Sequence, residues 1–555
     1  MKNLIIITTL LVLFGCTKQK EMELRNLIND IEAQVRPLNK EAALAYWNAT
    51  ISGDPLEFEK YSAANMQIVN IYSDRELFAK LKRINEEKKI KDPLLVRELE
   101  VVYNKFLGNQ TDTALLNDII QRSAALEQKY ATFRANYKGS AISDNQVENT
   151  LQTSINNNDL KEVWMAHKKI GPLVANDIIE IVKLRNMVAI SLGFDNYHTM
   201  SLELSGQKPD EVSELFDELD VLTKDAFANL KDEMDTYFAK RYKTEKEKLM
   251  PWHYQGRFFQ ESPQIYPLEL DKYYSGKNLE ELTKSYYLGI GLDVEQIMAN
   301  SDLYEKPGKN QHAYCIDIDS EGDIRVLCNI KDNEQWMGTM LHEFGHAVYA
   351  QGHDNPANPY FLREAAHSFT TEAVAMLFGR LSRNPEWMSQ MLELPLSEMD
   401  KIQDDCHKSS RLQQLVFSRW AQVMYRFEKE MYANPNQDLN ELWWTLVSKY
   451  QMLTKPEGRN EPDWATKIHV ALYPCYYHNY QLGELLASQF HYYIVNNITK
   501  SGNIKNDSYI GNKEVGDWIR EKVFEPGMKH KWNDMIEAAT GEKLTAKYYA
   551  SQFVD

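Results

Sequence analysis

The sequence lacks a membrane-spanning apolar run, has few cysteines and carries fewer basic than acidic residues. The uncharged, largely apolar run at residues 4–15 is too short to cross a bilayer, because a spanning helix needs about 20 residues. Five Cys in 555 residues exclude a disulfide-based scaffold. With 63 Lys+Arg against 80 Asp+Glu, the net charge of −17 argues against nucleic acid as a partner, since phosphate binding needs basic side chains. The 24 Gly and 18 Pro are too few for a fibrous or disordered chain.

The N-terminus predicts export. Lys2 precedes the apolar run 4–15, which has the length of a signal-peptide core. The run ends in Leu-Phe-Gly-Cys16, which resembles the bacterial lipobox, where cleavage precedes a lipidated Cys. We therefore expect a signal peptide at 1–15, a lipid-anchored tether at 16–25 and one domain at 26–555, held on the periplasmic or cell-surface side of a membrane. The alternative is a plain secretory signal with an incidental Cys.

The rest of the chain predicts a mostly α protein. Apolar residues recur at helical spacing over most segments, for example 174–193 and 210–240, with no repeat or Gly/Ser linker. One segment, 315–328, alternates like a β hairpin. A two-residue loop at Glu321-Gly322 would place Cys315 opposite Cys328, close enough for a disulfide in an exported protein.

The segment His342-Glu343-Phe344-Gly345-His346 predicts a metal site. Asp332 can cap a helix here, on which His342 and His346 project from one face and can bind one Zn²⁺. Glu343 lies beside them and suits a general base that activates water. Two packed core histidines are the alternative, but such spacing rarely arises by chance with only 13 His in the chain.

A catalytic zinc site needs a third protein ligand and one open position. Two acids lie at a suitable distance downstream, Glu364 and Glu372. Glu372 begins an apolar helical run and could face the site from a buried helix, whereas Glu364 follows Arg363 and could be an ion-paired surface residue. Spacing favours Glu372 without excluding Glu364.

Several segments together resemble the angiotensin-converting-enzyme family of zinc metallopeptidases. In that family a Leu-Arg-Glu segment follows the histidine helix, and the third zinc ligand lies nine residues after the arginine. Here the segment is Leu362-Arg363-Glu364, so the resemblance makes Glu372 the third ligand. The family also has a His-Ala pair thirty residues before the first zinc histidine. The segments that match the family well are His312-Ala313, Lys467-Ile468-His469-Val470, and Tyr477 with Tyr480. Weaker matches are Trp443-Trp444, Lys449-Tyr450-Gln451, Leu184-Arg185-Asn186 and Tyr46-Trp47-Asn48. Together these segments span most of residues 40–490.

The resemblance implies a two-lobed helical ellipsoid around a deep substrate cleft, with small β hairpins, and one Zn²⁺ per chain. It implies that Tyr480 and His469 stabilise the oxyanion. Tyr476 is a competitor to Tyr477, because this chain has one extra residue between His469 and the tyrosines. His312 and Ala313 would bind the substrate backbone. The residues that would hold the substrate's C-terminal carboxylate are Lys467, Tyr477 and Gln255.

The sequence departs from the family at two kinds of site. Its chloride-binding arginines fall at Asn479 and Val447 here, so no chloride activation is expected. The family's acid that orients a zinc histidine falls at Met376, so the histidine must be oriented in another way or zinc is held less tightly.

We therefore expect a lipid-anchored bacterial member, a zinc peptidyl-dipeptidase that removes C-terminal dipeptides from short unfolded oligopeptides. A thimet-type zinc oligoendopeptidase, a sibling family of the same shape, is one alternative. A non-catalytic, lipid-anchored peptide-binding protein is another.

Overall fold

A computed structural model describes residues 2–554, with side chains from Lys18 onward apart from that of Leu396. The predicted mostly α class with small hairpins is confirmed, whereas the two-lobed outline stays a prediction. In chain order the helices are α1 (Lys2–Ser52), α2 (Pro55–Tyr72), α3 (Arg75–Glu87), α4 (Pro93–Gly108), α5 (Thr113–Thr132), α6 (Asp144–Thr153), α7 (Asn157–Lys168), α8 (Ile170–Ser191), α9 (Tyr197–Leu204), α10 (Pro209–Tyr242), α11 (Asp271–Tyr274), α12 (Leu279–Gly289), α13 (Glu295–Asn300), α14 (Glu334–His353), α15 (Ser368–Gly379), α16 (Pro385–Met391), α17 (Leu396–Ala433), α18 (Leu439–Leu446), α19 (Ile468–Leu472), α20 (His478–Tyr493), α21 (Lys513–Ile519), α22 (Trp532–Thr540) and α23 (Lys547–Phe553). The strands are β1 (Ala135–Tyr137), β2 (Ser140–Ile142), β3 (Tyr314–Asp317) and β4 (Ile324–Leu327).

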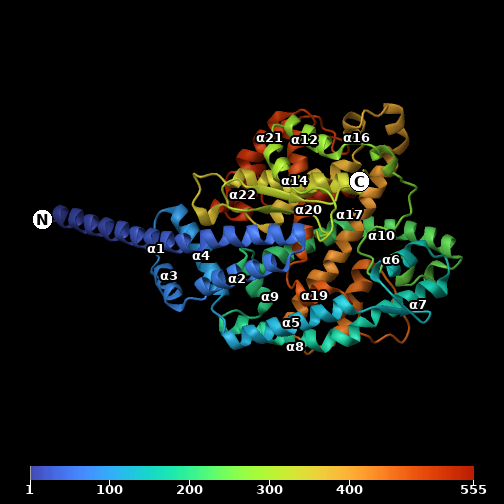
Figure 1. Cartoon of the computed structure of the whole chain (residues 1–555), viewed down its shortest axis with the longest axis horizontal. Coiled ribbons are helices and arrows are strands. Elements are labelled where there is room, and N and C mark those ends of the chain that lie inside the picture. The colour runs from blue at the N-terminus through green and yellow to red at the C-terminus, as the bar shows by residue number, and fades with distance from the viewer. Residues whose placement is uncertain (1, 555) are drawn as a thin grey trace.

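The long helix α1 extends at its N-terminal end beyond the rest of the molecule (Figure 1). Further along, Leu24, Ile28, Ile31 and Val35 are buried in a small core with residues of α3 and α4. The side chain of Cys16 lies outside the described residues, so its lipidation stays a prediction. Among the described helices, none is both long and apolar enough to serve as a membrane span.

The predicted hairpin exists, but its predicted register is wrong. In the antiparallel pair β3–β4, Cys315 lies opposite Val326, and Tyr314 lies opposite Leu327. The loop has four residues rather than two, because the backbone N–H of Ile318 donates to the carbonyl of Asp323 at 2.9 Å. The pairing is therefore shifted by two residues. Cys315 and Cys328 are free thiols, and the expected disulfide is absent from this part of the structure.

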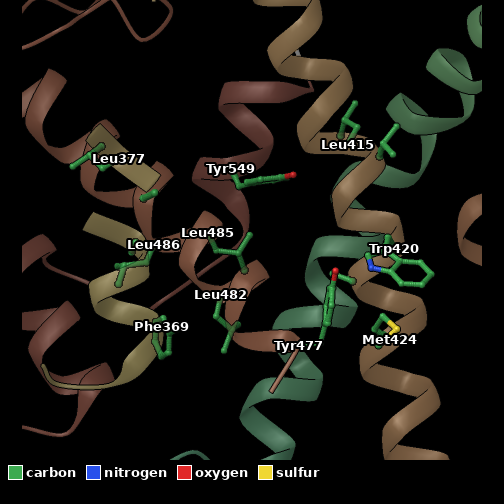
Figure 2. Close-up of a cluster of buried hydrophobic side chains, with 14 of the residues drawn as sticks. Phe369, Leu377, Leu415, Trp420, Met424, Tyr477, Leu482, Leu485, Leu486 and Tyr549 are labelled. Atoms are coloured by element: carbon green, nitrogen blue, oxygen red, sulfur yellow. The ribbon is translucent and has the colours of Figure 1, made fainter. Parts of the chain in front are cut away.

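The main core packs around α20. Figure 2 shows Leu482, Leu485 and Leu486 of α20 with side chains of α15 on one side and of α17 on the other. These leucines are fully buried, and burial of each contributes about 1.5–3 kcal/mol to folding. This packing fixes α20 beside α15.

The histidine helix α14 begins one residue later than predicted. Asn333, not Asp332, is its N-cap, because the Asn333 side chain accepts a hydrogen bond from the backbone N–H of Trp336 at 2.9 Å. The Asp332 carboxylate instead accepts from the backbone N–H of Gly276 at 2.7 Å, outside the helix.

Candidate active site

Three side chains from α14 and α15 converge as potential metal ligands. His342 Nε2 lies 3.8 Å and His346 Nε2 lies 4.0 Å from Glu372 Oε2. The donor atoms of the three residues all lie within 4.8 Å of one another. Ligand atoms 2.0–2.2 Å from one tetrahedral Zn²⁺ lie about 3.4 Å apart, so a small contraction would suit one ion. The other candidate acid, Glu364, lies elsewhere, and its Oε1 accepts from Lys105 Nζ at 2.7 Å.

Two glycines let the helices approach closely enough to bring these ligands together. A Cβ at Gly345 of α14 would lie 2.9 Å from the Cα of Ala375 in α15, closer than a side chain allows. A Cβ at Gly483 of α20 would lie 3.3 Å from the Cβ of Glu372. The positions of the ligands therefore follow from helix packing.

Burial favours the neutral form of both histidines, the form that binds metal. Desolvation by the surrounding helices lowers the pKa of His342 to about 4, and desolvation together with His342 lowers the pKa of His346. His346 Nδ1 is hydrogen-bonded to Thr371 Oγ1 at 2.8 Å, which orients the Nε2 atom toward Glu372. Sequence reasoning missed Thr371, although it directly precedes the predicted ligand.

Glu343 is buried beside the ligand cluster, with 8% of its surface exposed. Burial and then the neighbouring Glu372 raise its pKa to about 8, and the backbone N–H of Cys315 acts in the opposite direction. A carboxyl in such surroundings can accept and return a proton near neutral pH.

The structure supplies an acid that sequence reasoning missed. Burial and then Glu484 raise the pKa of Glu372 to about 7. Glu484 lies on α20, is paired with Arg380, and lines the same cavity as Met376, the position where the family has its acid. Only the packing of α20 on α15 brings Glu484 here, so no local sequence signal identified it.

A cavity of about 1450 Å³ collects most of the other predicted residues: Gln255, Lys467, His469, Tyr477 and Tyr480 all line it. Tyr476 is absent from this lining, although its ring centroid lies 5.4 Å from that of Tyr480. Tyr477 and Tyr480 can therefore contact a molecule in this cavity, whereas Tyr476 does not line it. His469 Nδ1 is buried and has no hydrogen-bond partner among the described residues.

Lys467 provides a buried cation in this cavity. Its Nζ donates to Gln260 Oε1 at 2.6 Å and lies 5.1–5.7 Å from the centroids of three aromatic rings. Burial and then Arg257 lower its pKa to about 8, so it is mostly charged at pH 7. Gln255 instead accepts from the backbone N–H of Gln264 at 2.7 Å. Sequence reasoning missed Gln260, which has no recognisable motif around it.

His312 and Ala313 directly precede β3. His312 is exposed and Ala313 is half-buried, and neither belongs to the linings of the described cavities. Alternate backbone groups of a strand point to opposite edges. Since the N–H of Cys315 faces Glu343, the backbone of Ala313 lies along the same unpaired edge of β3.

Comparisons with known proteins show what this chain is similar to. A profile of the angiotensin-converting enzyme family matches residues 18–553. Angiotensin-converting enzyme of Mesocricetus auratus is 22% identical over 432 residues, which cover 71% of this chain and 32% of the relative. An inactive angiotensin-converting enzyme-related protein of Caenorhabditis elegans is 22% identical over 281 residues, which cover 49% of this chain and 29% of the relative. Carboxypeptidase 1 of Bacillus subtilis (strain 168) is 23% identical over 256 residues, which cover 41% of this chain and 49% of the relative.

This chain thus spans less than half the length of the curated relatives it matches. The profile match nevertheless covers almost the whole of this chain, including every helix that contributes to the ligand cluster. The chain belongs to the angiotensin-converting enzyme family of peptidases.

Proposed function

We propose that this chain is a zinc-dependent peptidyl-dipeptidase that releases C-terminal dipeptides from short unfolded oligopeptides. One observation carries the proposal: Tyr480, His469 and the buried cation Lys467 line one cavity, which shares Met376 and Glu484 with an adjoining cavity lined by His342 and Glu343. Tyr480 lies close enough to Glu372 for that carboxylate to raise its pKa, after the effect of burial. The cavity can therefore hold a peptide with its reacting bond and its terminal carboxylate at different groups.

The residues at the cluster fit Zn²⁺. Two neutral imidazoles and one carboxylate form a catalytic-type ligand set that leaves one position open. A bound Zn²⁺ would act as a Lewis acid toward the scissile carbonyl and would make water more acidic. His342, His346 and Glu372 would hold it, and Thr371 would orient His346.

The protein's own groups would manage protons and charge. Glu343 would take a proton from the attacking water and deliver it to the leaving amine. Tyr480 and His469 would donate hydrogen bonds to the oxygen on which negative charge develops. Glu343 is only 8% exposed, so solvent screens its electrostatic interactions little.

The position of the cut would follow from recognition of the terminus. Lys467 would bind the terminal carboxylate, with Tyr477 beside it, while the unpaired edge of β3 near Ala313 would pair with an extended substrate backbone. Gln255, whose amide holds the loop to Gln264, would shape the pocket.

Mass spectrometry of the products tests the proposal. An N-blocked pentapeptide would be supplied as free acid and as C-terminal amide, with and without a zinc chelator. We expect a dipeptide to be lost from the acid only, and the chelator to abolish the reaction. Equal internal cleavage of both peptides would instead identify an oligoendopeptidase, and no cleavage would identify a binding protein. Glu372→Gln should lose both zinc and activity, whereas the matched control Glu364→Gln should keep both.

We further propose that the protein is exported and held at a membrane by lipid on Cys16, on the periplasmic or cell-surface side. A Cys16→Ser variant should then leave the membrane fraction while the wild type remains there. Equal recovery of both proteins in the soluble fraction would contradict lipid anchoring.

A further inference from the structure

A second group of potential metal ligands lies at the far end of the histidine helix. His353 is the last residue of α14, Asp354 follows it, and Asp317 ends β3. One donor atom from each of the three lies within 4.8 Å of the others. The cluster therefore connects α14, which carries His342 and His346, to the β3–β4 hairpin.

The polar atoms in this cluster are only partly satisfied. Asp317 Oδ1 accepts from the backbone N–H groups of Asp319 and Ser320, and Asp354 Oδ2 accepts from that of Gly322 at 2.8 Å. Within the described residues, His353 Nδ1 and Asp354 Oδ1 have no hydrogen-bond partner. These two atoms are 3.4 Å apart, and their residues are only 8% and 7% exposed. Buried polar atoms without partners are costly, so a ligand between them would be stabilising.

Among the described residues, no Lys or Arg compensates the charge of this cluster. In the described part of the chain, neither Asp317 nor Asp354 forms an ion pair with a Lys or Arg. The basic side chains of the adjoining cavity have other partners: Lys105 with Glu364 at 2.7 Å, Lys40 with Asp319 at 3.0 Å, and Arg363 with the carbonyls of Asn358 and Ser320 at 3.0 and 3.3 Å. Two neighbouring carboxylates in a buried site repel one another unless a cation or a proton lies between them.

A path for a small ion exists. Asp317 and His353 both line a cavity of about 570 Å³ between α1, α4 and the hairpin loop, separate from the cavity of the active site. One imidazole and two carboxylates suit Mn²⁺ or Zn²⁺, which accept both nitrogen and oxygen ligands. Ca²⁺ takes six to eight oxygen ligands, which this cluster does not supply.

We propose that Asp317, His353 and Asp354 bind a second divalent cation of the Mn²⁺ or Zn²⁺ type. The ion ties the end of β3 to the end of α14. Because the unpaired edge of β3 faces Glu343, the ion would also hold this strand in place beside the active site.

Manganese binding tests the site directly. The full chain is loaded with one equivalent of Zn²⁺ to fill the active site, and Mn²⁺ is then titrated, with free Mn²⁺ counted by electron paramagnetic resonance. We expect one Mn²⁺ per chain in the wild type. We also expect one in a His342→Ala/His346→Ala variant titrated without the added Zn²⁺, which would otherwise fill the proposed site. We expect none in Asp317→Asn/Asp354→Asn. The matched control Asp319→Asn, an acid of the same loop outside the cluster, should bind as the wild type does.

Thermal unfolding supplies a second readout. Mn²⁺ should raise the unfolding temperature of the wild type but not that of His353→Gln. This variant keeps both carboxylates, so it tests the site even if Asp317→Asn/Asp354→Asn does not fold. Absence of Mn²⁺ binding in the wild type would overturn the proposal and assign a shared proton to the carboxylate pair. Binding that persists in both Asp317→Asn/Asp354→Asn and His353→Gln would overturn it as well.

Discussion

Replacing Lys467 by Met removes the buried cation of the active-site cavity while keeping most of its stem. The Lys467 ammonium lies next to the ring of Tyr477 in this cavity. Because Lys467 is only 7% exposed, solvent screens its charge little. A hydrogen bond to a charged group in such a place contributes about 1.5–3 kcal/mol. For a peptide whose terminal carboxylate binds there, kcat/KM should therefore fall about 10- to 150-fold. For the corresponding amide, which carries no charge, the change should stay below about threefold.

The assay compares steady-state kinetics of the N-blocked acid and amide peptides at pH 7. The matched control is Lys272→Met, which removes an exposed cation from the lining of the same cavity and should change neither rate by more than about twofold. Equal losses for acid and amide in Lys467→Met would refute the assignment, because a structural defect affects both substrates alike. A loss confined to the acid in the Lys272 variant would place the carboxylate elsewhere.

Four other results are expected. Since burial lowers the pKa of Lys467 to about 8, KM for acid peptides should rise as pH increases through about 8 while KM for amides stays flat, which a pH series of KM would check. Tyr480→Phe should lower kcat about 10²- to 10³-fold by removing an oxyanion donor, whereas Tyr476→Phe, outside the cavity lining, should cost less than tenfold. Replacing chloride by acetate should leave activity unchanged, because Asn479 carries no charge and accepts from a glutamine; a large loss would contradict this. Gly345→Ala should destabilise the fold by about 1–3 kcal/mol, measured by calorimetry, and should lower the zinc content, measured by metal analysis. Unchanged stability and zinc content would show that α14 and α15 can move apart without cost.

Local patterns were enough to predict the mostly α class and some of its helices. The periodic segments 174–193 and 210–240 largely coincide with α8 and α10, because the apolar face of each helix determines both its sequence pattern and its burial. The hairpin was predicted with the wrong register. Asp317 accepts from two backbone N–H groups of the loop, which stabilises a four-residue turn that a two-residue rule does not anticipate.

The same limit applies to the active site. His342 and His346 lie on one turn of a helix, so their spacing alone predicted their convergence. The local pattern favoured Glu372, which begins an apolar helical run, but the family resemblance was needed to choose it over Glu364. Glu484 and Gln260 reach the site only through contacts between segments more than 100 residues apart, and such contacts leave no signature in one sequence.

The packing of the helices also determines how the ligand cluster should respond to the loss of the proposed Zn²⁺. In small zinc domains the metal itself organises the fold. Here the distance between His342 and Glu372 follows from the close contacts at Gly345 and Gly483 and from the buried leucines of α20, all of which are contacts between protein groups. The entropic cost of assembling the ligands is therefore met during folding rather than during metal binding. A change at Glu372 should consequently affect metal affinity far more than stability, whereas a change at either glycine should affect both.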